Sequence, residues 1–402
     1  MSIKNNVIVG SLLLLICASC SKERHVSSFG KNSPVVVDID LDPNRMNFLE
    51  ISEFIDSVKL IRLETTDECL ISNVADVLFY EELMVIHDEK TRSVLIFDND
   101  GNYKNKISAL GSGPNEYRNI TRVLIDEVKK QLILYDEDSR KLLFYTLDGK
   151  LIKTIADFCD RAVIQSIINL SNGNFLCYVY YYGGPSKYYG LWEVDSMGVY
   201  IRSLLTPEAI KYPLYSTGAS SHLYYLPNNK IGLSCGNEND IYHYTNDSIY
   251  KYLSYKLPQK TIIDYPNTGA MDLRGDKRPA TRRSNQEKGN YIFTEWLSKN
   301  MTYHISLYNK TNNNVVVARA LKTHSSSMCS LPGSITNNNK PDQIVIIVAP
   351  DAIQNCLLDD ENVPEATRAK VKDMVSDMSE DEIMGMNPIL EVMYVKSDGS
   401  VR

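Results

Sequence analysis

The sequence predicts an all-β fold, a six-bladed β-propeller with four-stranded antiparallel blades and a small helical insertion near the C-terminus. Three observations predict it. The order strand, tight turn, strand in Val94–Tyr117 returns about 48 residues later in Leu142–Ile155, and a repeat of that length is typical of a propeller blade. Turns of the Asp-Gly type separate the short apolar runs. Units of this kind follow one another along most of the chain.

The composition supports a globular protein and excludes one class of partner. Of the 402 residues, 43% are hydrophobic and 23% are charged, as in ordinary globular domains. The formal net charge of −7 argues against nucleic acid, because phosphate binding needs a basic surface. The chain has 26 tyrosines, which favour strands and also offer amphipathic rings to ligands.

The first twenty residues have the features of an export signal. Lys4 precedes the apolar run Val7–Ile16, which is shorter than the roughly 20 residues that a membrane-spanning helix needs. The small residues that follow, directly before Cys20, resemble a bacterial lipobox. This resemblance implies cleavage before Cys20 and a diacylglycerol on its sulfur, and the alternative is an ordinary signal peptide cut nearby. We therefore expect a signal peptide at 1–19, a flexible tether at 20–34 and one propeller domain at 35–402.

Such a lipoprotein is expected in the cell envelope, attached to a membrane through its N-terminal lipid. The residues after Cys20 are SKERH and lack the acidic run that often accompanies surface export. The sequence therefore favours the outer membrane with the protein facing the periplasm, and surface exposure stays open.

The expected strands can be given in chain order. Two strands, Val35–Leu41 and Val58–Glu64, precede the repeat. The first unit comprises Val74–Leu78, Leu83–His87, Ser93–Asp98 and Asn102–Ile107, and the second comprises Ile120–Asp126, Gln131–Asp136, Lys141–Leu147 and Lys150–Ile155. Later units span Val163–Leu204, His222–Leu257 and Tyr291–Leu321, and the innermost strand of the last of these cannot be identified.

The sixth unit begins with the apolar run Gln343–Ala349, which is typical of an inner strand buried on both faces. A helical insertion at about 362–384 follows, with Asn362 as a possible cap and Ser379–Glu382 as a possible capping box. The strand Ile389–Lys396 then ends the fold. We expect it to pair with Val58–Glu64, so that strands from both chain ends close the ring.

Three motifs carry a resemblance to a known family. They are Leu63–Thr66 (LETT), the I-F-D-x-x-G turn, and G-x-G-P-x-E-Y at Gly111–Tyr117, in which Asn115 stands where Gly is usual. The sequence resembles the six-bladed β-propeller lipoproteins that are abundant in gut anaerobic bacteria. The resemblance implies the fold and an envelope location, and it supplies no molecular activity.

The cysteines and histidines predict no cofactor and no metal site. Six cysteines remain after Cys20, and neither they nor the six histidines have the spacing of a zinc site or of a metalloprotease. A chain of this length does not need disulfides. We therefore expect mostly free, buried thiols.

Candidate ligand residues gather on one predicted face. Strand direction alternates within a blade, so the loops between blades and the loops between second and third strands share a face. On it we expect Gly111–Arg118, Asp88–Arg92, Asp136–Arg140, Tyr180–Tyr189 and Gly236–Asp240. Tyrosine rings stack on flat ligands and arginine grips carboxylates, so the candidate ligand-binding residues are Tyr181, Tyr182, Lys187, Tyr188, Tyr189, Tyr117, Arg92 and Arg140.

Each of these features also has a purely structural explanation. In the D-E-x-x-R turns, Asp and Arg can form a local ion pair of little energetic value, and Tyr117 can wedge between two blades. The predicted loop Pro258–Lys288 carries a basic cluster, which is either a solvated loop or an anion site. Its members are Arg274, Lys277, Arg278, Arg282 and Arg283.

The function that these features favour is a binding or scaffold module for a glycan or for an envelope protein partner. The alternative is a carbohydrate-active enzyme, either a glycoside hydrolase or a polysaccharide lyase, that uses the same face. No catalytic residue is predicted, because the sequence has no nucleophile elbow and no phosphate-binding glycine loop.

Overall fold

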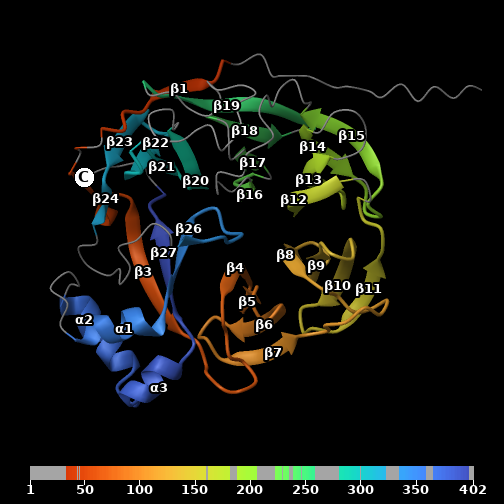
Figure 1. Ribbon diagram of the computed structural model, residues 1–402, viewed down its shortest axis with the longest axis horizontal. Helices are drawn as coiled ribbons and strands as arrows, with labels where there is room; N and C mark the ends of the chain where they lie inside the picture. The colour runs from red at the N-terminus through yellow and green to blue at the C-terminus, as the bar shows by residue number, and fades with distance from the viewer. Residues whose placement is uncertain are drawn as a thin grey trace, which may run out of the picture.

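Six four-stranded antiparallel blades surround a common axis in the computed structural model (Figure 1). The structure describes residues 33–42, 44, 46–159, 162–181, 188–205, 222–228, 230–234, 239–245, 247–258, 280–298, 300–322, 335–358 and 365–397. The predicted fold class and the number of blades are confirmed.

The first three blades follow the predicted repeat closely. Blade 1 contains β4 (Val74–Tyr80), β5 (Leu83–Asp88), β6 (Ser93–Asp98) and β7 (Tyr103–Ile107). Blade 2 contains β8 (Ile120–Asp126), β9 (Gln131–Asp136), β10 (Lys141–Thr146) and β11 (Leu151–Ile155). Blade 3 contains β12 (Ala162–Asn169), β13 (Phe175–Tyr181), β14 (Tyr188–Val194) and β15 (Tyr200–Leu205). In each blade the strand nearest the axis comes first in the sequence.

The remaining blades recruit segments from the N-terminal part of the chain. Blade 4 contains β16 (His222–Leu226), β17 (Lys230–Ser234), β18 (Asp240–Thr245) and β19 (Ser248–Lys256), and β1 (Val35–Asp38) joins β19 in parallel. Blade 5 contains β20 (Thr281–Lys288), β21 (Tyr291–Leu297), β22 (Tyr303–Asn309) and β23 (Asn314–Ala318). Beside it, β2 (Phe48–Glu50) pairs in parallel with β24 (Ala320–Lys322). The turn η1 (Ile51–Glu53) then leads into β3 (Ile55–Arg62).

The ring closes as the sequence predicts. Blade 6 has the order β25 (Ile335–Thr336), β26 (Gln343–Val348), β27 (Ile389–Val395) and β3. Antiparallel pairing places Leu390 opposite Ile61. One prediction was wrong in detail: Gln343–Val348 is the second strand of the blade, because the two-residue β25 lies inside it.

Equivalent positions of the 48-residue repeat adopt equivalent backbone conformations. Gly101 and Gly149 have φ of 91° and 85°, and Arg92 and Arg140 have φ of 53° and 50°. These values lie in the left-handed region that glycine tolerates best. At Gly101 a Cβ would lie 2.1 Å from the carbonyl oxygen of Arg62. The glycine of this turn is therefore fixed both by backbone conformation and by contact with the closing blade.

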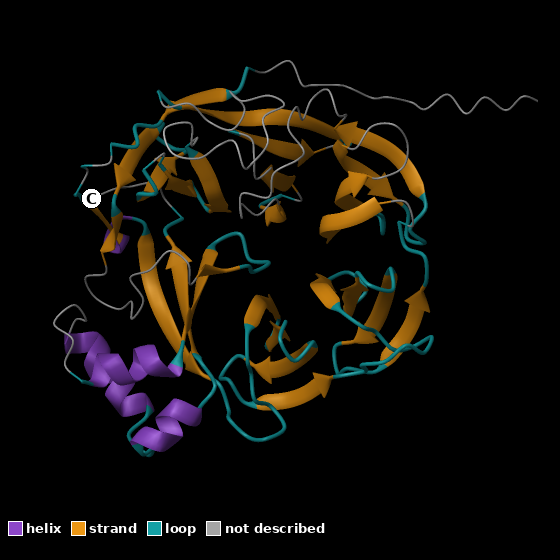
Figure 2. Ribbon diagram, viewed as in Figure 1, coloured by secondary structure: helices purple, strands orange, loops and turns teal. Residues whose placement is uncertain are grey.

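The helical insertion starts earlier than predicted, and its described part contains α1 (Pro350–Leu357), α2 (Glu365–Met374) and α3 (Glu380–Gly385). Figure 2 shows them grouped at one side of the ring, beside blade 6. The capping box is confirmed, since Ser379 and Glu382 exchange side-chain and backbone hydrogen bonds. Asn362 lies outside the described residues. The predicted start at about 362 was wrong because α1 has no side-chain cap and begins with Pro350.

The innermost strand of blade 5, β20, corrects another prediction. Its sequence is TRRSNQEK, which has no apolar alternation, and Pro258–Lys288 was therefore expected to be a loop. The polar side chains of β20 can lie in the interior because groups on neighbouring blades form hydrogen bonds with them. For example, Arg282 donates to the carbonyl oxygen of Asp240. Arg282 is buried, so the predicted basic loop does not exist at this end of the segment. Arg274, Lys277 and Arg278 lie outside the described residues.

The apolar core is divided among the six junctions between blades, each of which has its own cluster of buried side chains. Cys69, Cys159, Cys177 and Cys356 are buried thiols that take part in no disulfide, which agrees with the expectation for these four. Cys235 and Cys329 lie outside the described residues. None of the described helices has the length and apolar character needed to cross a membrane.

Candidate functional site

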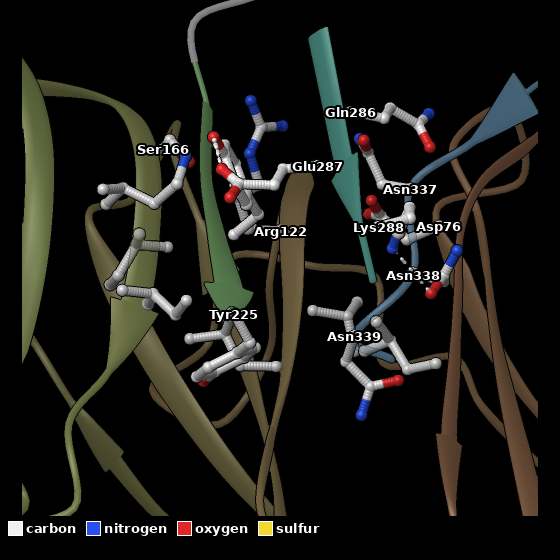
Figure 3. A pocket seen from close by; sticks show the side chains of 17 residues that line it. Asp76, Arg122, Ser166, Tyr225, Gln286, Glu287, Lys288, Asn337, Asn338 and Asn339 are labelled. Atoms are coloured by element: carbon white, nitrogen blue, oxygen red, sulfur yellow. Dashed lines mark hydrogen bonds between the residues drawn. The ribbon is translucent and has the colours of Figure 1, made fainter. Parts of the chain in front are cut away.

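A cavity of about 120 Å³ lies on the axis and is lined by residues from all six blades (Figure 3). The innermost strands β4, β8, β12, β16 and β20 contribute to it, and the segment after β25 supplies Asn337, Asn338 and Asn339. The cavity is smaller than the pockets of about 300–1,000 Å³ that enclose a drug-sized ligand. It therefore has room for ordered water or for one small polar group of a larger ligand.

Glu287 of β20 is the most completely partnered carboxylate of the cavity. Its Oε2 accepts from Tyr224 Oη at 3.0 Å and faces His243 Nε2 at 2.9 Å, and its Oε1 faces Lys310 Nζ at 3.2 Å. Burial raises the pKa of Glu287, but the hydrogen bonds and positive charges of His243 and Lys310 outweigh burial and leave the pKa below its usual value. Glu287 is therefore held as a carboxylate whose charge is already matched.

Asp76 of β4 lies beside a buried histidine. Its Oδ2 lies 3.2 Å from Nδ1 of His87, and Nε2 of the same ring lies 3.1 Å from the carbonyl oxygen of Ile120. Both nitrogens of the His87 ring therefore face an oxygen atom.

Arg122 of β8 differs from these groups, because among the described residues it has no ion-pair partner. Its two terminal nitrogens donate to the carbonyl oxygens of Thr121 and Gln165, the second of which belongs to the neighbouring blade. Its positive charge acts on Glu137 of the β9–β10 turn. Burial raises the pKa of Glu137, and the positive charge of Arg122 opposes that effect.

Lys288 is a second cation without a carboxylate partner among the described side chains. Its Nζ donates to the carbonyl oxygen of Lys340 at 2.7 Å and to Oδ1 of Asn338 at 3.1 Å. Burial lowers the pKa of the Lys288 amine to about 7, and the negative charge of Asp342 acts in the opposite direction. The amine therefore changes its charge close to neutral pH.

Three neutral side chains complete the polar lining. Ser166 accepts a hydrogen bond from the backbone N–H of Leu223 and keeps its own hydroxyl proton free to donate. Gln286 has a buried Oε1 without a partner among the described residues. The Asn337 side chain also lines the cavity, and in Figure 3 it lies close to Gln286 and Asp76.

The residues that the sequence singled out lie elsewhere, on the face that carries the blade-to-blade connections and the hairpins between second and third strands. We call this the loop face, and its described parts are Asp88–Arg92, Gly111–Arg118 and Asp136–Arg140. Contacts between them confirm that they share it: Arg92 Nη1 donates to the carbonyl oxygen of Arg118.

Tyr117 has the structural role that was one of its two predicted interpretations. Its side chain is 0% exposed, and its hydroxyl donates to the carbonyl oxygens of Arg92 and Ile107 at 2.9 and 3.2 Å. Burial raises the pKa of this hydroxyl to about 12. Tyr117 therefore joins blades 1 and 2 and has no surface to offer a ligand.

The D-E-x-x-R turns are also structural, but not through the expected ion pair. The buried carboxylate of Asp136 accepts backbone N–H bonds from Arg118, Asn119 and Ser139. Asp88 does the same for Ser72, Asn73, Lys90 and Thr91. In both turns the aspartate fixes the incoming blade connection to the hairpin beside it.

The tyrosine hairpin is described only in its backbone. Tyr181 ends β13 opposite Tyr188, and Tyr180 pairs with Tyr189, so these ends of β13 and β14 lie at the loop face. The side chains of these four residues, and Tyr182 and Lys187 entirely, lie outside the described residues. Their role as ligand residues stays a prediction.

Sequence reasoning missed Arg122, Glu287 and Lys288. Arg122 interrupts the apolar pattern of β8, which was a usable signal, whereas Glu287 and Lys288 lie in the polar β20, whose sequence offers none. The convergence of six strands on one axis is a property of the closed ring, and no local pattern reports which side chains meet there. Among the described residues, no three His, Cys, Asp or Glu side chains lie together in a way that could hold a metal ion.

The closed six-bladed ring with a polar axial cavity defines the chain as a β-propeller. Residues 34–394 match the family described as a domain of unknown function, DUF4934. The chain therefore belongs to that family.

Several solved structures are similar to it. A candidate exported protein from Bacteroides fragilis matches with 17% identity and a TM-score of 0.71, over 90% of this chain and 100% of that chain. A DUF4221 family member from Bacteroides vulgatus matches with 9% identity and a TM-score of 0.48, over 88% and 99% of the two chains. No curated protein matches the sequence. The likeness to the first structure supports the fold.

Proposed function

We propose that this protein is an exported, lipid-anchored β-propeller of the cell envelope that binds a glycan at its loop face. The observation that carries the proposal is the axial cavity, in which polar groups from all six blades surround a space of about 120 Å³. A cavity of this size takes one group of a ligand, and the rest of the ligand then lies outside the cavity.

The loop face is suited to binding because its turns are held in place. Asp88 and Asp136 each tie a blade connection to a hairpin through several backbone hydrogen bonds. Such preorganisation lowers the entropy that a ligand must overcome on binding. The predicted tyrosine hairpin rises from the same face and offers rings of the kind that stack on sugars.

A glycan fits the lining better than an apolar ligand does. Ser166, Gln286 and Asn337 present a hydroxyl and two amides, which are the groups that hydrogen-bond sugar hydroxyls and orient a ligand in a pocket. An envelope protein partner is the competing outcome, and it predicts binding that does not depend on these three side chains.

A glycan array with the full chain in detergent micelles tests the proposal. We expect binding to a subset of polysaccharides, lost when Tyr181, Tyr182, Tyr188 and Tyr189 are all replaced by alanine. If the wild-type protein binds no glycan, and the four-alanine variant behaves identically, the glycan proposal fails and a protein partner takes its place.

A second function, polysaccharide cleavage, is favoured by one cluster. Tyr224 and His243 each lie within hydrogen-bond distance of Glu287 beside the cavity, and such groups can transfer protons. Release of shorter products from a bound polysaccharide would support the enzyme. If the polysaccharide is bound but not shortened, and the Glu287→Gln protein binds the same amount, the result would support the binding module.

The lipid anchor and the periplasmic orientation belong to the same proposal. They are supported by the export signal, by Cys20 after small residues, and by the similarity to a candidate exported protein. Replacing Cys20 with serine should move the protein from the membrane fraction to the soluble fraction. Retention of the variant in the lipid fraction would contradict anchoring at Cys20.

A further inference from the structure

We infer that the axial cavity binds the carboxylate of an acidic sugar, with Arg122 as its charge partner. This inference rests on the proposed function and narrows it, because it selects acidic glycans from glycans in general. It follows from the charges, the free hydrogen-bond capacity and the size of the cavity.

The cavity contains one permanent cation without an ion pair among the described residues, the Arg122 guanidinium, which is not deprotonated in proteins. The Glu287 carboxylate faces His243 and Lys310, and the Asp76 carboxylate faces His87. A permanent cation without an ion pair attracts an anionic group.

Arg122 has unused donors for such a group. Guanidinium carries five N–H bonds, and two of its nitrogens each donate to one backbone carbonyl oxygen. Its planar fork suits a carboxylate better than a single point charge does. The two carbonyl bonds also fix the guanidinium between blades 2 and 3, so that it does not need to be ordered when the ligand arrives.

Neutral groups of the cavity favour a hydroxyl beside the carboxylate. Ser166 has a hydroxyl proton to donate, and the buried Gln286 Oε1 lacks a donor among the described residues. An unpaired buried acceptor is destabilising, and a ligand hydroxyl would pair with it. A carboxylate with a neighbouring hydroxyl is the arrangement of a uronic acid.

The size of the cavity limits the part of the ligand that enters. About 120 Å³ admits the carboxylate and its immediate substituents, whereas the remaining sugar units must lie outside the cavity. A terminal acidic sugar of a chain therefore fits the site, and an acidic sugar inside a stiff polymer does not enter it fully.

Calorimetric titration of the full chain in detergent micelles tests the inference with three probes: sodium galacturonate, its neutral counterpart galactose, and sodium acetate at matched ionic strength. We expect galacturonate to bind at least tenfold more tightly than galactose. The Arg122→Gln protein should lose at least tenfold in affinity for galacturonate. The matched control Lys130→Gln removes a cation that is 65% exposed and distant from the cavity lining, and it should bind as the wild-type protein does.

The outcomes separate the inference from the proposed function. Equal binding of galacturonate and galactose by the wild-type protein would overturn the carboxylate site while glycan binding stands. If acetate binds as tightly as galacturonate and loses the same affinity in the Arg122→Gln protein, the result would support a carboxylate site and contradict the claim that the site recognises a sugar. The comparison of probes on the wild-type protein remains decisive even if Arg122→Gln fails to fold.

Discussion

Single aspartates determine the order of the loop face. The 0% exposed Asp136 carboxylate accepts three backbone N–H groups, and removal of the carboxylate leaves these donors without a partner. We expect Asp136→Ala to lower the free energy of unfolding by about 3 kcal/mol. The exposed neighbour Asp138 offers a matched control, and its alanine variant should stay within about 0.5 kcal/mol of the wild-type protein. Urea unfolding measures both, and equal losses in the two variants would contradict the role of Asp136.

The buried amine of Lys288 gives the protein a defined pH dependence. Burial lowers its pKa in the folded state from 10.5 to about 7, so between these pH values the unfolded chain holds a proton that the folded protein has lost. Stability relative to Lys288→Met should therefore rise with pH, by at most about 1.4 kcal/mol per unit, and should stay constant below pH 7. The charged group that influences this amine is Asp342, which raises the pKa and so opposes burial.

Urea unfolding of both proteins between about pH 6 and about pH 9 checks this expectation. A difference in unfolding free energy between wild-type protein and Lys288→Met that does not change with pH would contradict the depressed pKa.

Among single residues, the turn positions could be predicted from the sequence, whereas most residues that line the axial cavity could not. Gly101 and Gly149 were recognisable because a tight turn makes a local demand on φ. Arg122 and Gln286 were not, because their partners belong to other blades and their roles depend on ring closure. Tyr117 was correctly placed on the loop, and its burial between two blades shows why a loop tyrosine is not by itself a ligand residue.

Among the elements, the helical insertion is held to the ring by a small apolar interface. Ile353 of α1 is 0% exposed, whereas Leu358, directly after the helix, is 69% exposed. Ile353→Asn should cost about 3 kcal/mol, because it loses apolar contacts and buries an unpaired amide. Leu358→Asn, which makes the same chemical change at the surface, should cost less than about 0.5 kcal/mol. Thermal unfolding compares them, and similar melting temperatures for the two variants would show that α1 does not pack on the ring.

Element prediction succeeded where local signals were strong and failed where neighbours decide the structure. The strands of blades 1 and 2 were predicted within about two residues, because apolar alternation and turns agree there. The polar β20 and the two-residue β25 had no such signal, since each becomes a strand by pairing with the strand beside it. The helix α1 was missed because it lacks a side-chain cap.

For the whole molecule, closure of blade 6 is the condition for a single cooperative fold. β27 lies between β26 and β3 and is the link between the two chain ends. Deletion of residues 389–402 should therefore leave β3 without its partner and abolish a cooperative unfolding transition. Deletion of residues 1–32, which precede every described strand, should preserve it. Circular dichroism melting distinguishes them, and a sharp transition in the C-terminal deletion would show that the ring does not need this closure.

The acidic-sugar site at the propeller axis is tested most directly by a crystal structure of the protein with galacturonate. We predict that the carboxylate lies in the axial cavity, with its oxygens about 3 Å from the Arg122 guanidinium nitrogens, and that a sugar hydroxyl contacts Ser166 or Gln286. A structure in which saturating galacturonate occupies another surface, while the axial cavity holds only water, would contradict it.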